Sequence, residues 1–237
     1  VGGVAYDRND NGDFSLIRLL SDGTLDSTFG AAGVTLTGFG QDDVIRKIVV
    51  QSDGKILVVG TTKDIYSAAD IAVARYNSDG SLDTGFASQG RLTLDLGGTN
   101  DYATGLALQG DRIVISAYAE DNNGYASAAL IRLTSSGQLD TSFAGGGKVL
   151  VNISGAYDTA WDVHVLSESG DKIVMTGSVN GDMALYQFNA DGSPDATVGA
   201  QGVSTVDFPS NTDTAPDLGY AVGVVDGNLA IAGAGWN

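Results

Sequence analysis

Short apolar stretches recur along the whole chain, and the segments between them are polar and rich in glycine and aspartate. One set of four lies at Val34–Thr37, Val44–Val50, Lys55–Gly60 and Ile71–Tyr76. Such stretches are rich in β-branched side chains and bounded by turn residues, which predicts strands. Counterparts follow at Arg91–Leu94, Ala103–Leu108, Arg112–Ala117 and Ala128–Leu133, and again from Lys148 and Val203 onward. The sequence therefore predicts an all-β fold.

Glycine and aspartate separate the second and third strands of each set. We expect two-residue hairpins there, since such pairs favour tight turns. The pairs are Asp53-Gly54, Gly110-Asp111, Gly170-Asp171 and Asp226-Gly227. Strands such as Ile71–Ala74 and Ile113–Ile115 are apolar at odd as well as even positions, that is, on both faces of the strand. This pattern predicts sheets that are covered on both faces.

A ten-residue segment occurs four times in related form. Its copies are SDGTLDSTFG (21–30), SDGSLDTGFA (78–87), SSGQLDTSFA (135–144) and ADGSPDATVG (190–199). The equivalent glycines Gly23, Gly80, Gly137 and Gly192 are 57, 57 and 55 residues apart. Four short strands in each of these intervals are typical of propeller blades. We therefore expect residues 1–237 to form a single β-propeller array of about four blades, each a four-stranded antiparallel sheet.

The two ends of the chain align with the same strand of the repeat. Val1–Ala5 and Ala230–Gly233 both correspond to the third strand, which is Val58–Thr62 in the second copy. Two segments would compete for one position if the four repeats closed on themselves. We expect an excerpt of a longer array, as in a ring of roughly six to eight blades.

The repeat resembles the delta-60 repeat family of bacterial β-propellers, whose function is unknown. The segments DGKILVVG (53–60) and ARYNSDGSLDTGFASQG (74–90) carry the resemblance, which extends over essentially the whole chain. The last copy departs from the pattern at Pro194 and Val198. The resemblance implies a propeller in a large exported or cell-surface protein, often attached to other extracellular modules. It brings no catalytic residues.

Charge and composition narrow the range of partners. Acidic residues outnumber Lys and Arg by 29 to 12, which gives a formal net charge of −17. Such a chain repels phosphate backbones and anionic headgroups, so we expect no nucleic-acid partner. Cysteine is absent, which excludes thiolate chemistry and disulfides. The apolar runs are too short to span a bilayer, and we expect no membrane insertion.

Several polar residues recur with the repeat. We expect the turn aspartates to accept backbone N–H bonds, although a ring of them could hold a cation. A second series precedes the second strand and has the pattern of loop-fixing carboxylates. Arginines recur in one strand of each copy, with Gln187 in their place in the last copy, and we expect them to pair with aspartates or backbone carbonyls. If they line a channel instead, they could bind an anion. The three series are Asp26, Asp83, Asp140 and Asp195; Asp43, Asp101, Asp158 and Asp217; and Arg18, Arg75 and Arg132.

One loop matches the first half of a calcium-binding loop. It offers the oxygen ligands Asp7, Asn9, Asn11 and Asp13, with Gly12 at the sixth position. Arg18 stands at the twelfth position, where a bidentate Glu would be required, and a strand replaces the following helix. An Asn-Gly hairpin would give a similar sequence. Calcium at these four residues is the only cofactor that we expect.

Other candidate residues are few. His164, the only histidine, would have to serve any Ser-His-Asp triad, but a hydrogen-bonded structural role is the simpler interpretation. Aromatic residues in or beside loops could form a sugar-binding surface or cap blade edges. They include Tyr66, Tyr118, Tyr125 and Trp236.

We therefore expect a non-catalytic structural or binding propeller that serves adhesion, scaffolding or assembly outside the cell or at its surface. Its partner would be a protein or polysaccharide of the cell surface, or companion domains and further copies of a longer chain. The alternative is a glycosidase or polysaccharide lyase that uses carboxylates such as Glu120, Asp121 or Asp162. Function is expected where the copies differ, in the loops Asp7–Asp13, Lys63–Asp70, Glu120–Ser127 and Asn180–Asp182.

Overall fold

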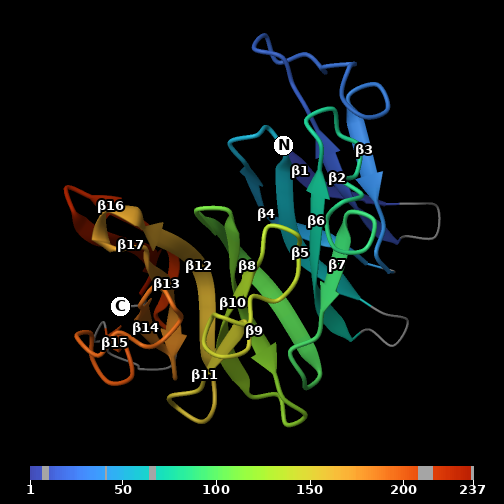
Figure 1. Cartoon of the computed structure of the whole chain (residues 1–237). Coiled ribbons are helices and arrows are strands. Elements are labelled where there is room, and N and C mark those ends of the chain that lie inside the picture. Colours follow the sequence, from blue (N-terminus) through green and yellow to red (C-terminus); the bar gives the residue numbers. More distant parts are fainter. Residues whose placement is uncertain (7–10, 41, 64–67, 208–215, 236–237) are drawn as a thin grey trace. The chain divides into compact units, whose positions relative to one another are not determined.

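A computed structural model describes the chain except residues 7–10, 41, 64–67, 208–215 and 236–237 (Figure 1). The described residues form 17 β-strands and one short 3-10 turn, η1 (Ser167–Ser169). The prediction of an all-β fold is confirmed. No helix in this part of the chain could cross a membrane. The chain divides into two compact units, Val1–Ala103 and Thr104–Asn237.

The first unit contains two antiparallel sheets. One has three strands in the order β1-β2-β3, and the other has four in the order β4-β5-β6-β7. The strands of the three-stranded sheet are β1 (Gly2–Tyr6), β2 (Gly12–Ile17) and β3 (Val34–Thr37). The strands of the four-stranded sheet are β4 (Val44–Val50), β5 (Ile56–Lys63), β6 (Ala69–Tyr76) and β7 (Arg91–Leu94).

The strands that follow form two further four-stranded sets and a hairpin. The order β8-β9-β10-β11 is followed by β12-β13-β14-β15 and by the hairpin β16-β17. Strand β8 begins in the first unit, where Asn100 forms a parallel bridge with Ala69. The bounds are β8 (Asn100–Gln109), β9 (Arg112–Glu120), β10 (Ala126–Leu133), β11 (Lys148–Val151), β12 (Asp158–Leu166), β13 (Lys172–Val179), β14 (Asp182–Phe188), β15 (Val203–Val206), β16 (Leu218–Val225) and β17 (Asn228–Ala234).

The sheets are offset by one strand from the sets read from the sequence. The short strand was grouped with the strands that follow it, but β3 pairs with β2 and β7 pairs with β6. The short strand therefore forms the last strand of the preceding sheet, and the ten-residue turn segment of that repeat connects it to the strand before it. Periodicity gives the spacing of strands, whereas only the hydrogen bonds show where one sheet ends. Strand β1 pairs with β2 as β5 pairs with β6, and β17 pairs with β16 as β5 pairs with β4, so both correspond to β5, in agreement with the sequence alignment.

The hairpin turns follow the prediction only in part. Asp226 and Gly227 have φ values of 51° and 77°, as a two-residue type I′ turn requires. The β4–β5 connection is longer, because Gln51 N–H donates to the Lys55 carbonyl and Gly54 N–H to the Gln51 carbonyl. The β12–β13 connection contains η1. The expectation of two-residue turns is therefore wrong at these two connections.

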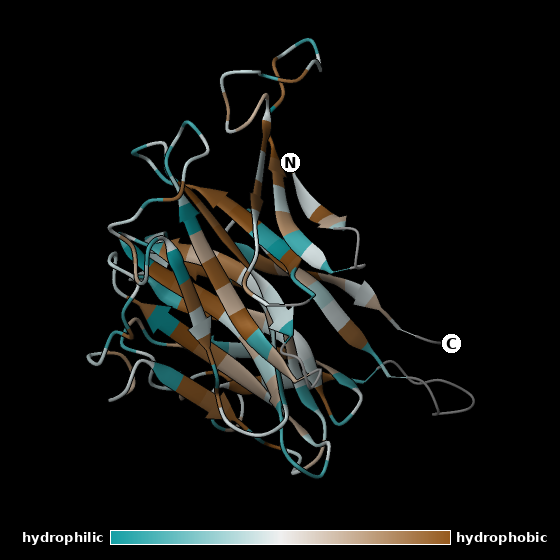
Figure 2. Cartoon of the chain, turned by 90° about the vertical axis from the view of Figure 1, so that its right-hand side faces the viewer, coloured by the Kyte–Doolittle hydropathy of each residue, from teal (hydrophilic) through white to brown (hydrophobic). Residues whose placement is uncertain are grey.

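The core of each unit lies between sheets. In the first unit, Phe14 and Phe29 pack with Val58, Ala72 and Tyr76. In the second unit, β9 and β10 contribute a cluster together with β13 and β14, including Leu130, Met175, Tyr186 and Phe188. Figure 2 shows that apolar residues predominate along the strands and polar residues along many of the connecting loops.

The middle strands are buried on both faces. All but one residue of β6 and of β10 are buried, so the predicted two-sided covering is confirmed. Strand β5 extends three residues beyond the predicted Gly60, because Thr61 and Thr62 are also buried, at 5% and 6% exposure. These two threonines continue the pairing with Ile71 and Asp70, so Asp70, which was expected in the loop Lys63–Asp70, is a strand residue.

Candidate functional site

The turn aspartates serve the fold. Asp140 accepts hydrogen bonds from the Ser142 N–H at 3.2 Å and the Ser142 hydroxyl at 2.6 Å. Asp26 and Asp195 make the same pair of bonds with Thr28 and Thr197, and Asp83 accepts from the Gly85 N–H. The prediction that these aspartates close their own turns is confirmed.

A cationic or amide side chain completes each of these turns. Arg18, Arg75 and Arg132 donate through Nε to the turn aspartate at 2.7, 2.7 and 2.9 Å. Gln187 replaces the arginine in the last repeat and donates to Asp195 at 2.7 Å. The three arginines also lie over phenylalanine rings, 4.4 to 4.9 Å from their centroids. The strand arginines are thus internal ion pairs, as predicted.

These contacts hold the aspartates in the ionised form. The pKa of Asp140 is lowered, chiefly by the Ser142 hydroxyl and despite burial. Burial alone would raise the pKa of Asp83, but the Lys55 ammonium, the Gly85 N–H and Arg75 lower it below its ordinary value. The pKa of Asp195 is strongly lowered, first by the Lys172 ammonium, which lies 2.5 Å away.

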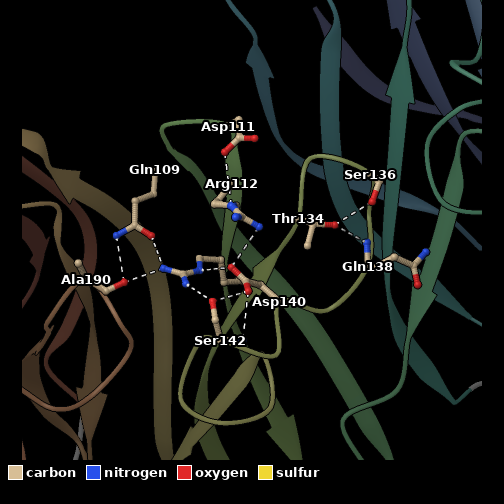
Figure 3. A network of polar contacts seen from close by, with 10 residues as sticks. Gln109, Asp111, Arg112, Thr134, Ser136, Gln138, Asp140, Ser142 and Ala190 are labelled. Carbon is tan, nitrogen blue, oxygen red and sulfur yellow. Dashed lines mark hydrogen bonds and ion pairs between the residues drawn. The ribbon is translucent and has the colours of Figure 1, made fainter.

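The arginines also join consecutive repeats. Arg132 Nη1 donates to the Ala190 carbonyl and to Gln109 Oε1, both at 2.6 Å, and Gln109 donates to the same carbonyl at 3.3 Å. Figure 3 shows Gln109, Asp140, Ser142 and Ala190 in this network. In the first unit, Arg18 donates in the same way to the Ser78 carbonyl. We call this arrangement of strand arginine, turn aspartate and next-repeat carbonyl the arginine clasp.

The second aspartate series fixes the loops that lead into the next sheet. Asp43 is fully buried and accepts the Phe39 N–H at 2.6 Å, and Asp101 accepts the Leu96 N–H at 2.5 Å. Asp158 accepts the N–H groups of Ile153 and Ser154. The loop-fixing role is confirmed for these three residues.

The predicted calcium loop is only partly described. Asp7 and Asn9 lie outside the described residues. Asn11 directly precedes β2, and Asp13 lies within β2, where it pairs with Ala5 of β1. Gly12 is also a strand residue, paired with Tyr6, rather than the turn residue of a calcium loop.

Another group of carboxylates was not found from the sequence. Asp70 in β6, Asp95 after β7 and Asp101 in β8 offer carboxylate oxygens that all lie within 4.8 Å of one another. Three oxygen ligands at such distances are compatible with a hard cation. Gly38 and Asn152 stand at the positions equivalent to Asp95, four residues after the start of β3 and β11, whereas Asp207 keeps an aspartate at this position after β15. An aspartate at this position in two of the four copies is the signal that the sequence offers.

His164 lies on the wall of a cavity. The cavity has a volume of about 450 Å³ and is lined by His164, Ser167, Glu168 and Ser169 together with apolar residues of β12, β16 and β17. His164 is exposed in β12, opposite Val174 of β13. The expected structural hydrogen bond to its imidazole is not found among the described residues.

The carboxylates considered for an enzyme also hold backbone groups. Asp121 accepts the N–H groups of Asn123 at 2.8 Å and Tyr125 at 3.0 Å, which fixes the β9–β10 loop. Asp162 is buried and accepts the Val222 N–H at 3.3 Å. The arrangement of these two residues is that of loop and strand anchors.

Aromatic side chains gather at one end of the sheets in the second unit. The ring centroids of Tyr118 and Trp161 are 5.8 Å apart, and those of Trp161 and Tyr220 are also 5.8 Å apart. Tyr125 and Tyr157 form a second pair at 6.0 Å. Tyr118 and Tyr125 were candidates from the sequence, whereas Trp161, Tyr157 and Tyr220 were missed because they lie in strands or at strand entrances. Tyr66 and Trp236 lie outside the described residues.

The repeats match a known family. The match is to a β-propeller family described as a domain of unknown function, DUF5122, at residues 1–29, 51–86, 109–143 and 171–197. No similar protein was found among curated proteins. The four matched segments cover more than half of the chain, and each includes all but the last one or two residues of a turn segment. The chain therefore belongs to the DUF5122 β-propeller family.

Proposed function

We propose that the chain is a run of four-stranded blades of the delta-60 type, in a non-catalytic propeller of a secreted or cell-surface bacterial protein. Its role would be to bind a protein or polysaccharide at the cell surface, in adhesion, scaffolding or assembly. The proposal rests on the contrast between repeated polar residues, which stabilise the fold, and aromatic residues that differ between copies. The turn aspartates and strand arginines are engaged with one another, whereas among the described residues the exposed Tyr125, Tyr157 and Tyr220 do not recur at the same position of every copy.

The turn aspartate and strand arginine of the arginine clasp have little capacity left for a ligand. Asp140 already accepts hydrogen bonds from Ser142 and Arg132, and the remaining arginine nitrogens bond to Gln109, Ser142 and Ala190. Charged groups with saturated hydrogen bonds rigidify a structure. Residues repeated in this way usually do repeated structural work.

The aromatic residues have the opposite character. Tyr125, Tyr157 and Tyr220 are 44%, 57% and 48% exposed. Large aromatic side chains are enriched at binding surfaces because they bury much area at a low entropic cost. A net charge of −17 also disfavours anionic partners.

Calcium at Asp7, Asn9, Asn11 and Asp13 stays part of the proposal on the strength of the sequence pattern alone, since Asp13 belongs to β2. An acidic loop ordered by an ion would add to a surface role without adding catalysis.

A binding survey tests the proposed function. The purified chain is offered to bacterial cells, polysaccharides and cell-surface proteins, and binding is expected to survive substitution of any single carboxylate, such as Asp121→Asn. Failure to bind any of these surfaces would contradict the proposal. Turnover of a polysaccharide that one Asp or Glu substitution abolishes would show that the chain is an enzyme instead.

A further inference from the structure

Two of the aromatic residues lie at a β-bulge that occurs at the same place in several sheets. The register of β12 with β13 shifts between Ala160 and Asp162, so Trp161 is the bulged residue. Tyr220 is the bulged residue of β16, between Gly219 and Ala221. A β-bulge changes the direction in which a side chain points. In both strands the bulge places an aromatic ring in contact with its neighbour.

The fold does not require an aromatic residue at this position. The corresponding bulge of β4 lies between Ile45 and Lys47, and the bulged residue there is Arg46, which is exposed. Since one bulge geometry accommodates an arginine, Trp161 and Tyr220 are not explained by the needs of the backbone. Residues that differ between structural copies are candidates for recognition.

The rings form a continuous row. Tyr118 of β9 contacts Trp161 of β12 at an interplanar angle of 51°, and Trp161 contacts Tyr220 of β16 at 76°. We call these three residues the aromatic row. The pair Tyr125 and Tyr157 lies at the same end of the strands, since Ala126 bonds to Ala156 and Tyr157 directly precedes β12.

We propose that the aromatic row binds a neutral polysaccharide, which names the ligand class within the surface-binding function proposed above. Aromatic rings present apolar faces beside a polar hydroxyl, and sugar rings likewise combine C–H faces with hydroxyl groups. Tyr220 is exposed and Tyr118 and Trp161 are half-buried, so the row offers a chain of linked sugars one exposed ring and two partly accessible ones. Anionic polysaccharides are disfavoured, because the protein carries a net charge of −17.

The indole nitrogen of Trp161 distinguishes a sugar from a cationic ligand. Trp161 Nε1 is shielded from solvent and has no hydrogen-bond partner among the described residues. Indole N–H is only a donor, and a buried donor without an acceptor is costly. Because Nε1 is shielded, a sugar hydroxyl or a water accepts this bond only when the side chains around it move, whereas an ammonium group offers only further donors and could not accept it at all.

Tryptophan fluorescence provides the test. The chain contains two tryptophans, so the Trp236→Phe variant reports on Trp161 alone. We expect soluble neutral glucan or galactomannan to change this emission in a saturable way, and alginate and polylysine to leave it unchanged. Tyr220→Ala in the same background should weaken binding about tenfold or more. Tyr6→Ala, at a 69% exposed tyrosine of the first unit, is the matched control and should bind normally.

The outcomes separate this proposal from the broader one. Unchanged affinity of the Tyr220→Ala variant, or saturable binding of polylysine alone, would overturn the aromatic row as a glycan site. Binding to a cell-surface protein without any neutral glycan would do the same and leave the surface-binding function standing. Absence of binding to all of these ligands and to whole cells would contradict both.

Discussion

Arg132 and Ala190 join two consecutive repeats through one hydrogen bond, from the guanidinium Nη1 to the carbonyl oxygen at 2.6 Å. The two residues are 58 positions apart in the sequence. The same guanidinium donates through Nε to Asp140 of its own repeat and lies over Phe143. One side chain therefore closes a turn and fastens that turn to the next one.

Breaking this clasp should destabilise the fold. Arg132→Met removes the bonds to Gln109, Asp140 and Ala190, which takes the donor from Gln109 Oε1 and the nearest cation from buried Asp140. We expect a loss of about 2–4 kcal/mol in the free energy of unfolding. Urea denaturation measures it.

Arg112→Met is the matched control for this substitution. Arg112 also approaches Asp140, at 3.5 Å, but its side chain is 41% exposed. Exposed ion pairs contribute less than about 1 kcal/mol to the free energy of unfolding, so Arg112→Met should lower it by no more than that. Equal losses for the two variants would show that the clasp contributes no more than an ordinary surface charge.

Gly192 tests how closely consecutive turns pack. Its φ is 86°, and a Cβ added there would lie 2.7 Å from the Phe143 ring. Gly170 has a φ of 76° and open space around the same Cβ position. Gly170→Ala should cost the backbone strain alone, about 1 kcal/mol, and Gly192→Ala should cost about 1–3 kcal/mol more, because the ring must move. Similar melting temperatures for the two variants would argue against this packing.

The turn aspartates predict sensitivity to acid. The folded-state pKa of Asp195 lies well below the ordinary 3.8, through Lys172, Thr197 and Gln187. Its contribution is complete above the unfolded-state pKa and is lost as the pH falls through the folded-state pKa. Stability should therefore decline below about pH 4, and Asp195→Asn should flatten that decline. In thermal melts across this range, Asp226→Asn, at an exposed turn residue, should follow the wild type. A decline that both variants keep unchanged would remove Asp195 as a cause.

Calcium binding would make the melting temperature depend on the concentration of the ion. If the Asp7–Asp13 loop binds the ion, a chelator should lower the melting temperature and excess calcium should restore it. Asp7→Asn should remove most of the difference. A transition that is identical with and without the chelator would exclude calcium from the structure.

The fold could be predicted from the sequence to the level of strands and repeats, but not to the level of sheets. The spacing of Gly80 and Gly137 gave the repeat, because a repeated turn imposes a repeated residue. The short strand Arg91–Leu94 was assigned to the following set, although it pairs with β6. Strand periodicity contains no information on partners, which are chosen by register and packing.

The candidate site was harder to predict, and for a related reason. Tyr118 and Tyr125 were noticed because they are near loops, whereas Trp161 and Tyr220 are in strands. Their contact depends on bulges in β12 and β16, and a one-residue register shift leaves no regular mark on the hydrophobic pattern. The group Asp70, Asp95 and Asp101 was missed because three different segments bring it together.

The most direct test of the division between structural repeats and variable recognition residues is a comparison of two variants, Asp140→Asn and Tyr220→Ala, by binding to neutral glycan with a parallel thermal melt. Asp140→Asn is expected to lower the melting temperature and leave affinity for glycan unchanged below the transition. Tyr220→Ala is expected to weaken binding and leave the melt unchanged. The reverse pattern, with binding lost at Asp140 and retained at Tyr220, would show that the repeated residues form the site.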